Sequence, residues 1–152
     1  MDRLLMFIAT GAGSGYLPKA PGTWGSLVGL LFWLVIGRMA LPAYLCVIGA
    51  LFVIGVFSAG AAEKIVDLGD PAMVVIDEIV GMLVALTAAP FHPVAVLAGL
   101  LLFRFFDIVK PFPINWLDRH LHGGLGIMID DIAAGLAALI ILQLGLRFFP
   151  IA

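Results

Sequence analysis

The sequence predicts an all-α integral membrane protein, a single domain over residues 1–152 built as a bundle of about six helices. Of the 152 residues, 63% are hydrophobic and only 12% are charged, which lies far outside the range of soluble domains. The charges are concentrated in three polar stretches that separate long apolar runs. The formal net charge of −2 leaves no basic surface for nucleic acid, so nucleic acid partners are excluded.

The first polar stretch, Thr10–Ser26, is predicted to be an ordered loop. It contains five glycines, two prolines and Lys19, a composition that disfavours a regular helix and leaves backbone N–H groups free. Such a loop can cradle phosphate, with Lys19 adding a positive charge. The alternative is a plain connecting turn, and the spacing does not match a Walker A loop.

Two apolar helices are expected next, at about Trp24–Gly37 and Leu41–Ala62, with a tight turn between them. The first would be roughly 21 Å long and the second roughly 33 Å, so only the second is long enough to cross a bilayer of about 30 Å.

The second polar stretch, Glu63–Glu78, turns at Gly69-Asp70-Pro71 and leads into an apolar run, Ala72–Ala89, that contains Asp77 and Glu78. Acidic side chains at a helix start can simply complement the helix dipole. Here both lie within apolar sequence, where ionised groups usually have a function.

A second apolar hairpin is expected at Ile79–Ala89 and Val94–Phe106, with its turn at Pro90–Pro93. The third polar stretch follows within Phe103–Asp131, and a final apolar helix is expected at Ile132–Phe149. The third stretch carries Arg104, Asp107 and Lys110 near its start and the pair Asp130-Asp131 at its end.

If each apolar run crosses the membrane, all three polar stretches lie on one side. That side then holds all ten carboxylates and six of the eight basic residues, leaving two opposite, Arg38 and Arg147. By the positive-inside rule, the polar side faces the cytoplasm. If the short first helix only lies in the interface, the N-terminal loop would instead be on the opposite side.

The two carboxylate pairs occupy similar contexts. Asp77-Glu78 and Asp130-Asp131 are each predicted to open an apolar helix, and Gly81 and Gly135 follow about one turn later, where they would let another backbone approach. Two such helices packed together would gather four carboxylates, whose repulsion a divalent cation would offset. All-oxygen ligands favour Mg²⁺ or Mn²⁺ over zinc. The alternative is two acidic helix starts without a metal.

Arg104, Asp107 and Lys110 recur at a spacing that covers one helical face. Arg104 offers a fork for phosphate oxygens, Lys110 a point charge, and Asp107 can hold a cation or reach the metal. A set of membrane-interface anchors is the alternative. His120 and His122 lie in an exposed loop and are expected to be solvated.

The sequence lacks the active-site motifs of several classes of phosphatase. The sequence has no Cys-x5-Arg, no Asp-x-Asp-x-Thr and no Ser-Gly-His pattern, and Cys46 lies inside an apolar run. A metal-activated water or an Asp nucleophile remains possible. Two other classes stay open: a small cation channel or transporter with a carboxylate-lined path, and a scaffold subunit without chemistry.

Three stretches, GSGYLPKAPGTWGS, VVIDEIVG and FRFFDIVKPFPINWLDRHLHGGLGIMIDDIAAG, resemble the signature regions of the phosphatidylglycerophosphatase A family in order and spacing. The similarity covers nearly the whole chain. It implies a Mg²⁺-dependent membrane phosphatase that converts phosphatidylglycerophosphate to phosphatidylglycerol. It also implies a fold in which one central helix is surrounded by about five others.

Together these observations give a specific hypothesis for the site, at the cytoplasmic face of a bacterial inner membrane. The expected metal ligands are Asp77, Glu78, Asp130 and Asp131, and the expected catalytic residues are Asp107, Asp130 and Asp131. Phosphate is expected to bind Lys19, Arg104, Lys110 and the N–H groups of Gly22 and Thr23. The lipid tails of the phospholipid substrate would remain in the bilayer. None of these features encodes an oligomeric state.

Overall fold

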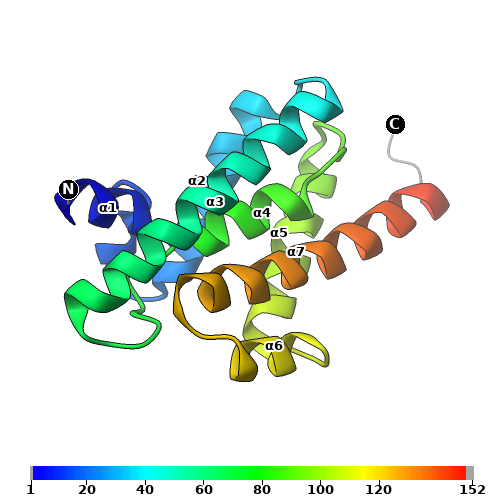
Figure 1. Ribbon diagram of the computed structural model, residues 1–152. Coiled ribbons are helices and arrows are strands. Elements are labelled where there is room, and N and C mark those ends of the chain that lie inside the picture. Colours follow the sequence, from blue (N-terminus) through cyan, green and yellow to red (C-terminus); the bar gives the residue numbers. More distant parts are fainter. Residues whose placement is uncertain (1, 150–152) are drawn as a thin grey trace.

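The computed structural model describes residues 2–149. Over this range the chain forms seven α-helices and one 3-10 turn, and no strand (Figure 1). The elements are α1 (Asp2–Ala9), η1 (Ser14–Tyr16), α2 (Pro21–Ile36), α3 (Leu41–Val66), α4 (Ile76–Ala85), α5 (Pro93–Val109), α6 (Ile114–His120) and α7 (Gly123–Phe148). The predicted all-α class is confirmed.

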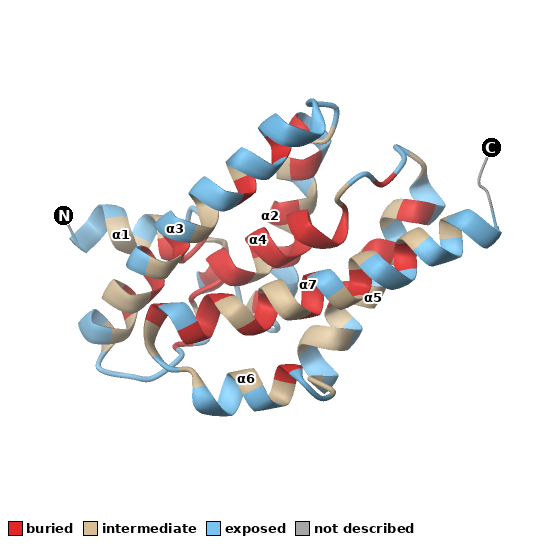
Figure 2. Cartoon of the chain, turned by 45° about the vertical axis from the view of Figure 1, so that its right-hand side comes forward, coloured by how far each residue is buried: buried red, intermediate tan, exposed pale blue. Residues whose placement is uncertain are grey.

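Helix α4 lies in the middle of the bundle, where it contacts α2, α3, α5 and α7 (Figure 1). Nine of its ten residues are buried, so most of the helix is red in Figure 2. A helix that is apolar on every side can be stable only when other helices cover all of its faces. The single central helix implied by the family resemblance is therefore present.

The backbones of α4 and α7 approach closely at two glycines. A Cβ placed on Gly81 would come within 2.9 Å of the carbonyl oxygen of Asp131, and one on Gly135 would come within 2.5 Å of the carbonyl oxygen of Gly81. The prediction that these glycines allow another backbone to approach is confirmed. The contact sets the two acidic segments next to each other.

Two helices, α3 and α7, are long and apolar enough to cross a membrane, with 26 residues each. At 1.5 Å per residue each extends about 39 Å, whereas the 16 residues of α2 reach only about 24 Å. Large apolar side chains also cover the outer surface, including Val35 (77% exposed) and Phe57 (70% exposed). A surface of this kind is typical of a protein surrounded by lipid.

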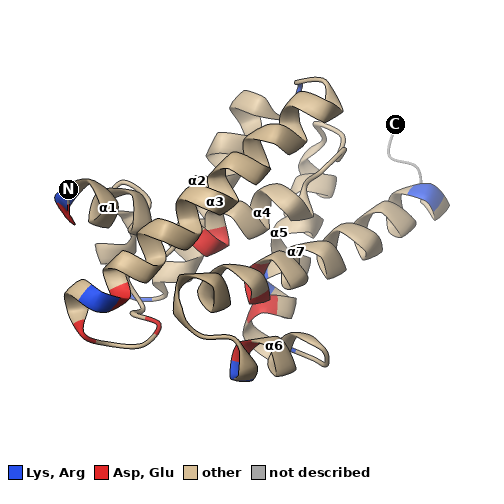
Figure 3. Ribbon diagram, in the orientation of Figure 1, with Lys and Arg blue, Asp and Glu red and all other residues tan. Residues whose placement is uncertain are grey.

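Charged residues are distributed unevenly along the bundle, as predicted. In Figure 3 every acidic segment lies towards the half that holds α1, α6 and the start of α7. The turn between α2 and α3, and the last turn of α7, carry only the basic residues Arg38 and Arg147.

Three helix boundaries differ from the predictions. The loop expected through Ser26 ends earlier, because α2 begins at Pro21, which suits the first helical position. Helix α7 begins at Gly123, so Asp130 and Asp131 lie well inside it and do not open it. The start of α7 is held by packing: a Cβ on Gly124 would overlap the carbonyl group of Val56 in α3.

The third difference is the length of α4, which spans only Ile76–Ala85 of the expected apolar run. It therefore ends inside the bundle, and its last carbonyl groups need partners other than water. Three neighbouring helices supply them. Trp33 Nε1 of α2 donates to Leu86 O (3.0 Å). Tyr44 Oη of α3 donates to Leu83 O (2.6 Å), and Gln143 Nε2 of α7 donates to Thr87 O (2.9 Å).

Candidate active site

A pocket of about 390 Å³ opens where α4 begins, and all three polar stretches of the sequence contribute to its wall. Eight of the ten carboxylate residues line it, together with two cationic residues, Arg104 and Lys110. The carboxylates are Glu63, Asp70, Asp77, Glu78, Asp107, Asp118, Asp130 and Asp131. Such an excess of negative charge requires compensation before an anionic ligand can enter.

Three carboxylates form the inner part of this pocket. Asp77 and Glu78 come from the first turn of α4, and Asp131 comes from α7. One oxygen from each side chain lies within 4.8 Å of the other two. Asp77 is 9% exposed and Asp131 is 3% exposed, so water can do little to separate their charges.

The same three side chains each hold a buried oxygen without a hydrogen-bond partner among residues 2–149: Asp77 Oδ1, Glu78 Oε2 and Asp131 Oδ2. Buried polar atoms in folded proteins nearly always have partners, and a buried, unpaired carboxylate is costly. Three neighbouring carboxylates, each with one bare oxygen, fit a hard divalent cation with oxygen ligands. The residues present therefore fit the metal that the sequence suggested.

Asp130 occupies a different position from its neighbour Asp131. Its Oδ2 accepts a hydrogen bond from Lys110 Nζ at 2.5 Å, while its Oδ1 is buried without a partner. It is not part of the group of three carboxylates that lie within 4.8 Å of one another. Its role as a fourth metal ligand stays a prediction.

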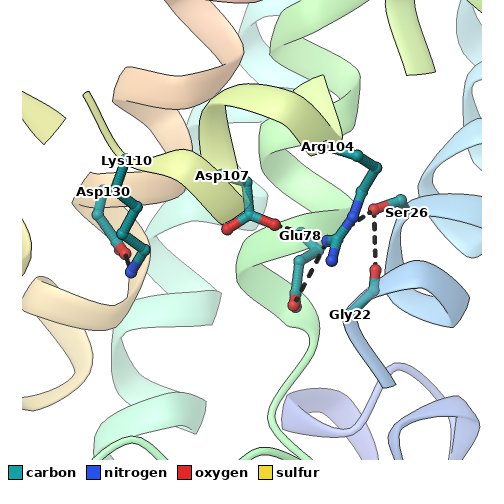
Figure 4. Close-up of polar contacts among 7 residues, drawn as sticks. All are labelled: Gly22, Ser26, Glu78, Arg104, Asp107, Lys110 and Asp130. Atoms are coloured by element: carbon teal, nitrogen blue, oxygen red, sulfur yellow. Dashed lines mark hydrogen bonds and ion pairs between the residues drawn. The ribbon is translucent and has the colours of Figure 1, made fainter. Parts of the chain in front are cut away.

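Arg104 lies between the carboxylates and the start of α2 (Figure 4). Its NH1 atom forms an ion pair with Asp107 Oδ2 at 2.6 Å and is 3.9 Å from Glu78 Oε1. NH1 also donates to Ser26 Oγ at 3.3 Å. The prediction that Asp107 can hold a cation is confirmed, and the cation it holds is Arg104.

Lys110 caps α5 with a left-handed backbone conformation (φ 43°). Its ammonium group donates to Asp130 and to Asp118 Oδ1, the latter at 2.6 Å. Partial burial lowers the pKa of Lys110, but the hydrogen bonds to Asp118 and Asp130 outweigh this and leave its pKa raised. Lys110 is therefore charged throughout the physiological pH range, and it connects α5, α6 and α7.

Asp118 is a site residue that the sequence analysis missed. It lies in α6, within a segment that looked like a connecting loop because it is rich in Pro, Gly and His. The signal available in the sequence was an acidic residue eight positions after the basic Lys110, which could form an ion pair with it. The path of the backbone between the two residues could not be inferred from composition.

The residues expected to bind phosphate separate into two groups. Gly22, Arg104 and Lys110 line the pocket, whereas Lys19 and Thr23 are exposed outside its lining. The N–H group of Thr23 donates to Ala20 O at 2.9 Å. The start of α2 thus faces the pocket through Gly22.

The two histidines of the third polar stretch also differ. His122 is exposed at the wall of the pocket. His120 lies outside it, stacked on Trp116 with ring centroids 4.6 Å apart and with Nδ1 2.8 Å from Trp116 O. Both are exposed, in agreement with the expectation that they are solvated.

Comparison with known proteins gives a consistent result. A family model described as phosphatidylglycerophosphatase A matches residues 7–146. The chain is 41% identical over 143 residues to phosphatidylglycerophosphatase A of Escherichia coli (strain K12), covering 93% of this chain and 80% of that protein. It is 38% identical over 136 residues to the Haemophilus influenzae protein of the same name, covering 88% and 83%.

A Bacteroides thetaiotaomicron protein named as a candidate phosphatidylinositol-3-phosphatase is 39% identical over 147 residues, covering 91% of each chain. No solved structure matches the chain. The family model covers most of the chain, and the relatives are similar over most of their own lengths. On this basis, the chain belongs to the phosphatidylglycerophosphatase A family.

Proposed function

We propose that this protein hydrolyses the terminal phosphate monoester of phosphatidylglycerophosphate, giving phosphatidylglycerol and inorganic phosphate. The observation that carries the proposal is the group of three bare, buried oxygens of Asp77, Glu78 and Asp131 beside Arg104 in one pocket. Family membership supplies the substrate, since the Escherichia coli and Haemophilus influenzae relatives bear that name.

Asp77, Glu78 and Asp131 would hold a divalent cation, proposed to be Mg²⁺ because all the ligands are oxygens, with Asp130 Oδ1 as a further candidate ligand. When bound, the cation would supply positive charge that offsets the carboxylates and stabilises charge on the phosphoryl group.

The protein's own cations would orient the phosphate. Arg104 offers a planar fork and Lys110 a charged ammonium group, and both line the pocket beside Gly22. Lys19 and Thr23 remain candidate contacts for the rest of the headgroup, since both are exposed and directly flank the lining residues Ala20–Gly22 in the sequence.

Proton transfer is assigned to the carboxylates near the phosphate. The ion pair of Asp107 uses Oδ2, which leaves Oδ1 to accept a proton from the attacking water and to return it to the departing lipid alkoxide, which becomes the hydroxyl group of the product. Asp130 and Asp131 are the other catalytic candidates, because both line the pocket next to the same space.

The rim of the pocket is compatible with a lipid substrate. Ile108 lines the pocket and is still 70% exposed, and the neighbouring Phe105 and Phe112 are 54% and 80% exposed. Apolar side chains at the rim would contact hydrocarbon, so the tails of the substrate can remain in the bilayer while the headgroup enters.

The direct test uses detergent-purified protein with phosphatidylglycerophosphate and Mg²⁺, followed by EDTA. We expect phosphate release that stops with EDTA and returns with excess Mg²⁺. Phosphatidylinositol 3-phosphate, included because of the Bacteroides relative, should be a poorer substrate. Ion flux through reconstituted vesicles without any phosphate release would instead support a channel or transporter.

We further propose that the pocket faces the cytoplasm, because the half of the bundle around it holds the larger share of basic residues. Arg119 in α6 is exposed and gives a reporter position. An Arg119→Cys variant in a Cys46→Ala background should react with a membrane-impermeant maleimide in inverted inner-membrane vesicles. Equal labelling in intact spheroplasts would contradict this orientation.

A further inference from the structure

Ser26 is a fully buried polar residue (0% exposed) on α2 that lies against the guanidinium group of Arg104 (Figure 4). Its Oγ donates to Gly22 O at 2.8 Å and accepts from Arg104 NH1 at 3.3 Å. A hydroxyl group has one proton to donate, and here it is donated in a hydrogen bond to the carbonyl oxygen of Gly22. The lone pairs of the hydroxyl are thus available to Arg104.

Gly22 makes this arrangement possible because it has no side chain. A Cβ at position 22 would overlap Glu78 Oε1 and lie only 2.9 Å from Arg104 NH1. The first turn of α2 therefore packs its backbone directly against the guanidinium group. Gly22 also fixes the rotamer of Ser26 through its carbonyl group.

All the recorded polar contacts of Arg104 use the same nitrogen, NH1, which meets Ser26, Asp107 and Glu78. Two of these three partners are carboxylates, and Glu78 belongs to the group that fits a metal. Ser26 is the neutral partner and comes from α2. It holds NH1 on the α2 side and leaves NH2 for a ligand in the pocket.

We infer that Ser26, supported by Gly22, is a positioning residue that orients Arg104 for the phosphate group of the substrate. The inference rests on the proposed function, in which Arg104 binds phosphate. Without the Ser26 hydroxyl, the guanidinium group is attracted only to Asp107 and Glu78, and it turns away from the phosphate towards the metal ligands. Substrate binding is then weakened more than turnover.

The test is Ser26→Ala in the full-length purified protein, assayed with phosphatidylglycerophosphate and Mg²⁺. We expect KM to rise about tenfold, the size expected for a lost hydrogen bond to a charged group, with kcat within about twofold of the wild type. The inhibition constant for inorganic phosphate, which is the product, should rise in parallel.

A matched control is Ser58→Ala. Ser58 is also fully buried in a helix, and its Oγ donates to Gly55 O at 3.2 Å, but it lies on α3 and its hydroxyl group makes no hydrogen bond to Arg104. Loss of the Ser58 hydroxyl group should leave KM and the inhibition constant for phosphate unchanged. Thermal unfolding of both variants checks that each remains folded.

A double-mutant cycle separates positioning from a structural role. If Ser26 acts through Arg104, Ser26→Ala should have almost no further effect on KM in an Arg104→Lys background. An equal rise of KM in both backgrounds would overturn the inference, as would an unchanged KM for Ser26→Ala alone.

Calorimetry of inorganic phosphate binding in the presence of Mg²⁺ gives a readout that needs no turnover. Failure of the proposed function would appear as a wild-type protein that binds phosphate but hydrolyses no lipid phosphate. Failure of the inference would appear as equal phosphate affinity in the wild type and Ser26→Ala.

Discussion

The two ends of α4 differ in whether their buried polar groups have hydrogen-bond partners. At its C-terminal end, the carbonyl groups of Leu83, Leu86 and Thr87 each accept a hydrogen bond from a side chain of a surrounding helix. At its N-terminal end, Asp77 and Glu78 each present a buried oxygen with no partner in the described part of the chain. Both ends belong to one helix of ten residues.

This difference locates the function within the bundle. Three long side chains from three helices satisfy neutral carbonyls, although each such carbonyl costs less to bury than a carboxylate does. The bundle therefore can supply partners, yet it leaves one buried oxygen of Asp77 and one of Glu78 without a hydrogen bond from the described part of the chain. Bare oxygens gathered on several buried carboxylates of one pocket indicate a ligand that the chain does not itself provide.

The largest expected effect comes from Asp131→Asn, which tests whether the bare oxygens at the N-terminal end bind a metal. Phosphate release should fall by about 100-fold or more, since losing a charged ligand removes several kcal/mol of transition-state stabilisation. The measurement is Mg²⁺-dependent phosphate release by the purified protein. Retention of half the activity would exclude Asp131 as a ligand.

The thermal stability of Asp131→Asn is a second test of metal binding at the N-terminal end of α4. Removing one negative charge from a group whose oxygens lie within 4.8 Å relieves repulsion, so the metal-free variant should unfold at the same temperature as the metal-free wild type or higher. Mg²⁺ should raise the unfolding temperature of the wild type only. A variant that unfolds at a lower temperature without metal would mean that Asp131 has a structural role instead.

A smaller effect is expected for Lys110→Ala, which tests whether the N-terminal end recruits an anion. KM should rise about tenfold with a smaller change in kcat, because the variant loses one charged contact to the phosphate group. Steady-state kinetics at fixed Mg²⁺ measures this. Lys64→Ala is the control, since Lys64 is exposed in the last turn of α3 and does not line the pocket. An unchanged KM for Lys110→Ala would count against the role of Lys110.

The smallest effect on activity is expected at the other end of α4. Tyr44→Phe removes the 2.6 Å hydrogen bond to Leu83 O and should lower the free energy of unfolding by about 1 kcal/mol, or roughly 2–4 °C in unfolding temperature. The activity of the folded protein should stay within about twofold of the wild type. A loss of activity comparable to that of Asp131→Asn would show that the two ends of α4 are not functionally separate.

Much of this arrangement was predictable because it depends on local sequence. The apolar runs predicted the helices, and the charge pattern predicted that the acidic residues gather in one half of the bundle. Asp77 and Glu78 were correctly expected near the start of a helix, since they come a few residues after the turn at Gly69-Asp70-Pro71. Gly81 and Gly135 correctly indicated close backbone contact.

Other features depended on how each helix is rotated and where it begins. Asp130 and Asp131 are adjacent in sequence, but neighbours on a helix point about 100° apart, so Asp131 joins Asp77 and Glu78 while Asp130 pairs with Lys110. Ser26 lay where the expected loop, Thr10–Ser26, and the expected helix from about Trp24 overlap. The packing of α2 against α4 and α5 brings the start of this helix, which begins at Pro21, against Arg104.

By itself, the sequence determined the all-α class, the apolar character of the bundle and the identity of most charged residues in the pocket. These properties follow from composition and from the order of residues along the chain. The tertiary structure alone decided which carboxylates come together, which cation each acidic side chain pairs with, and which helix contacts and orients Arg104. Those choices depend on helix rotation and on backbone approach at glycines, which are set by contacts between segments far apart in the sequence.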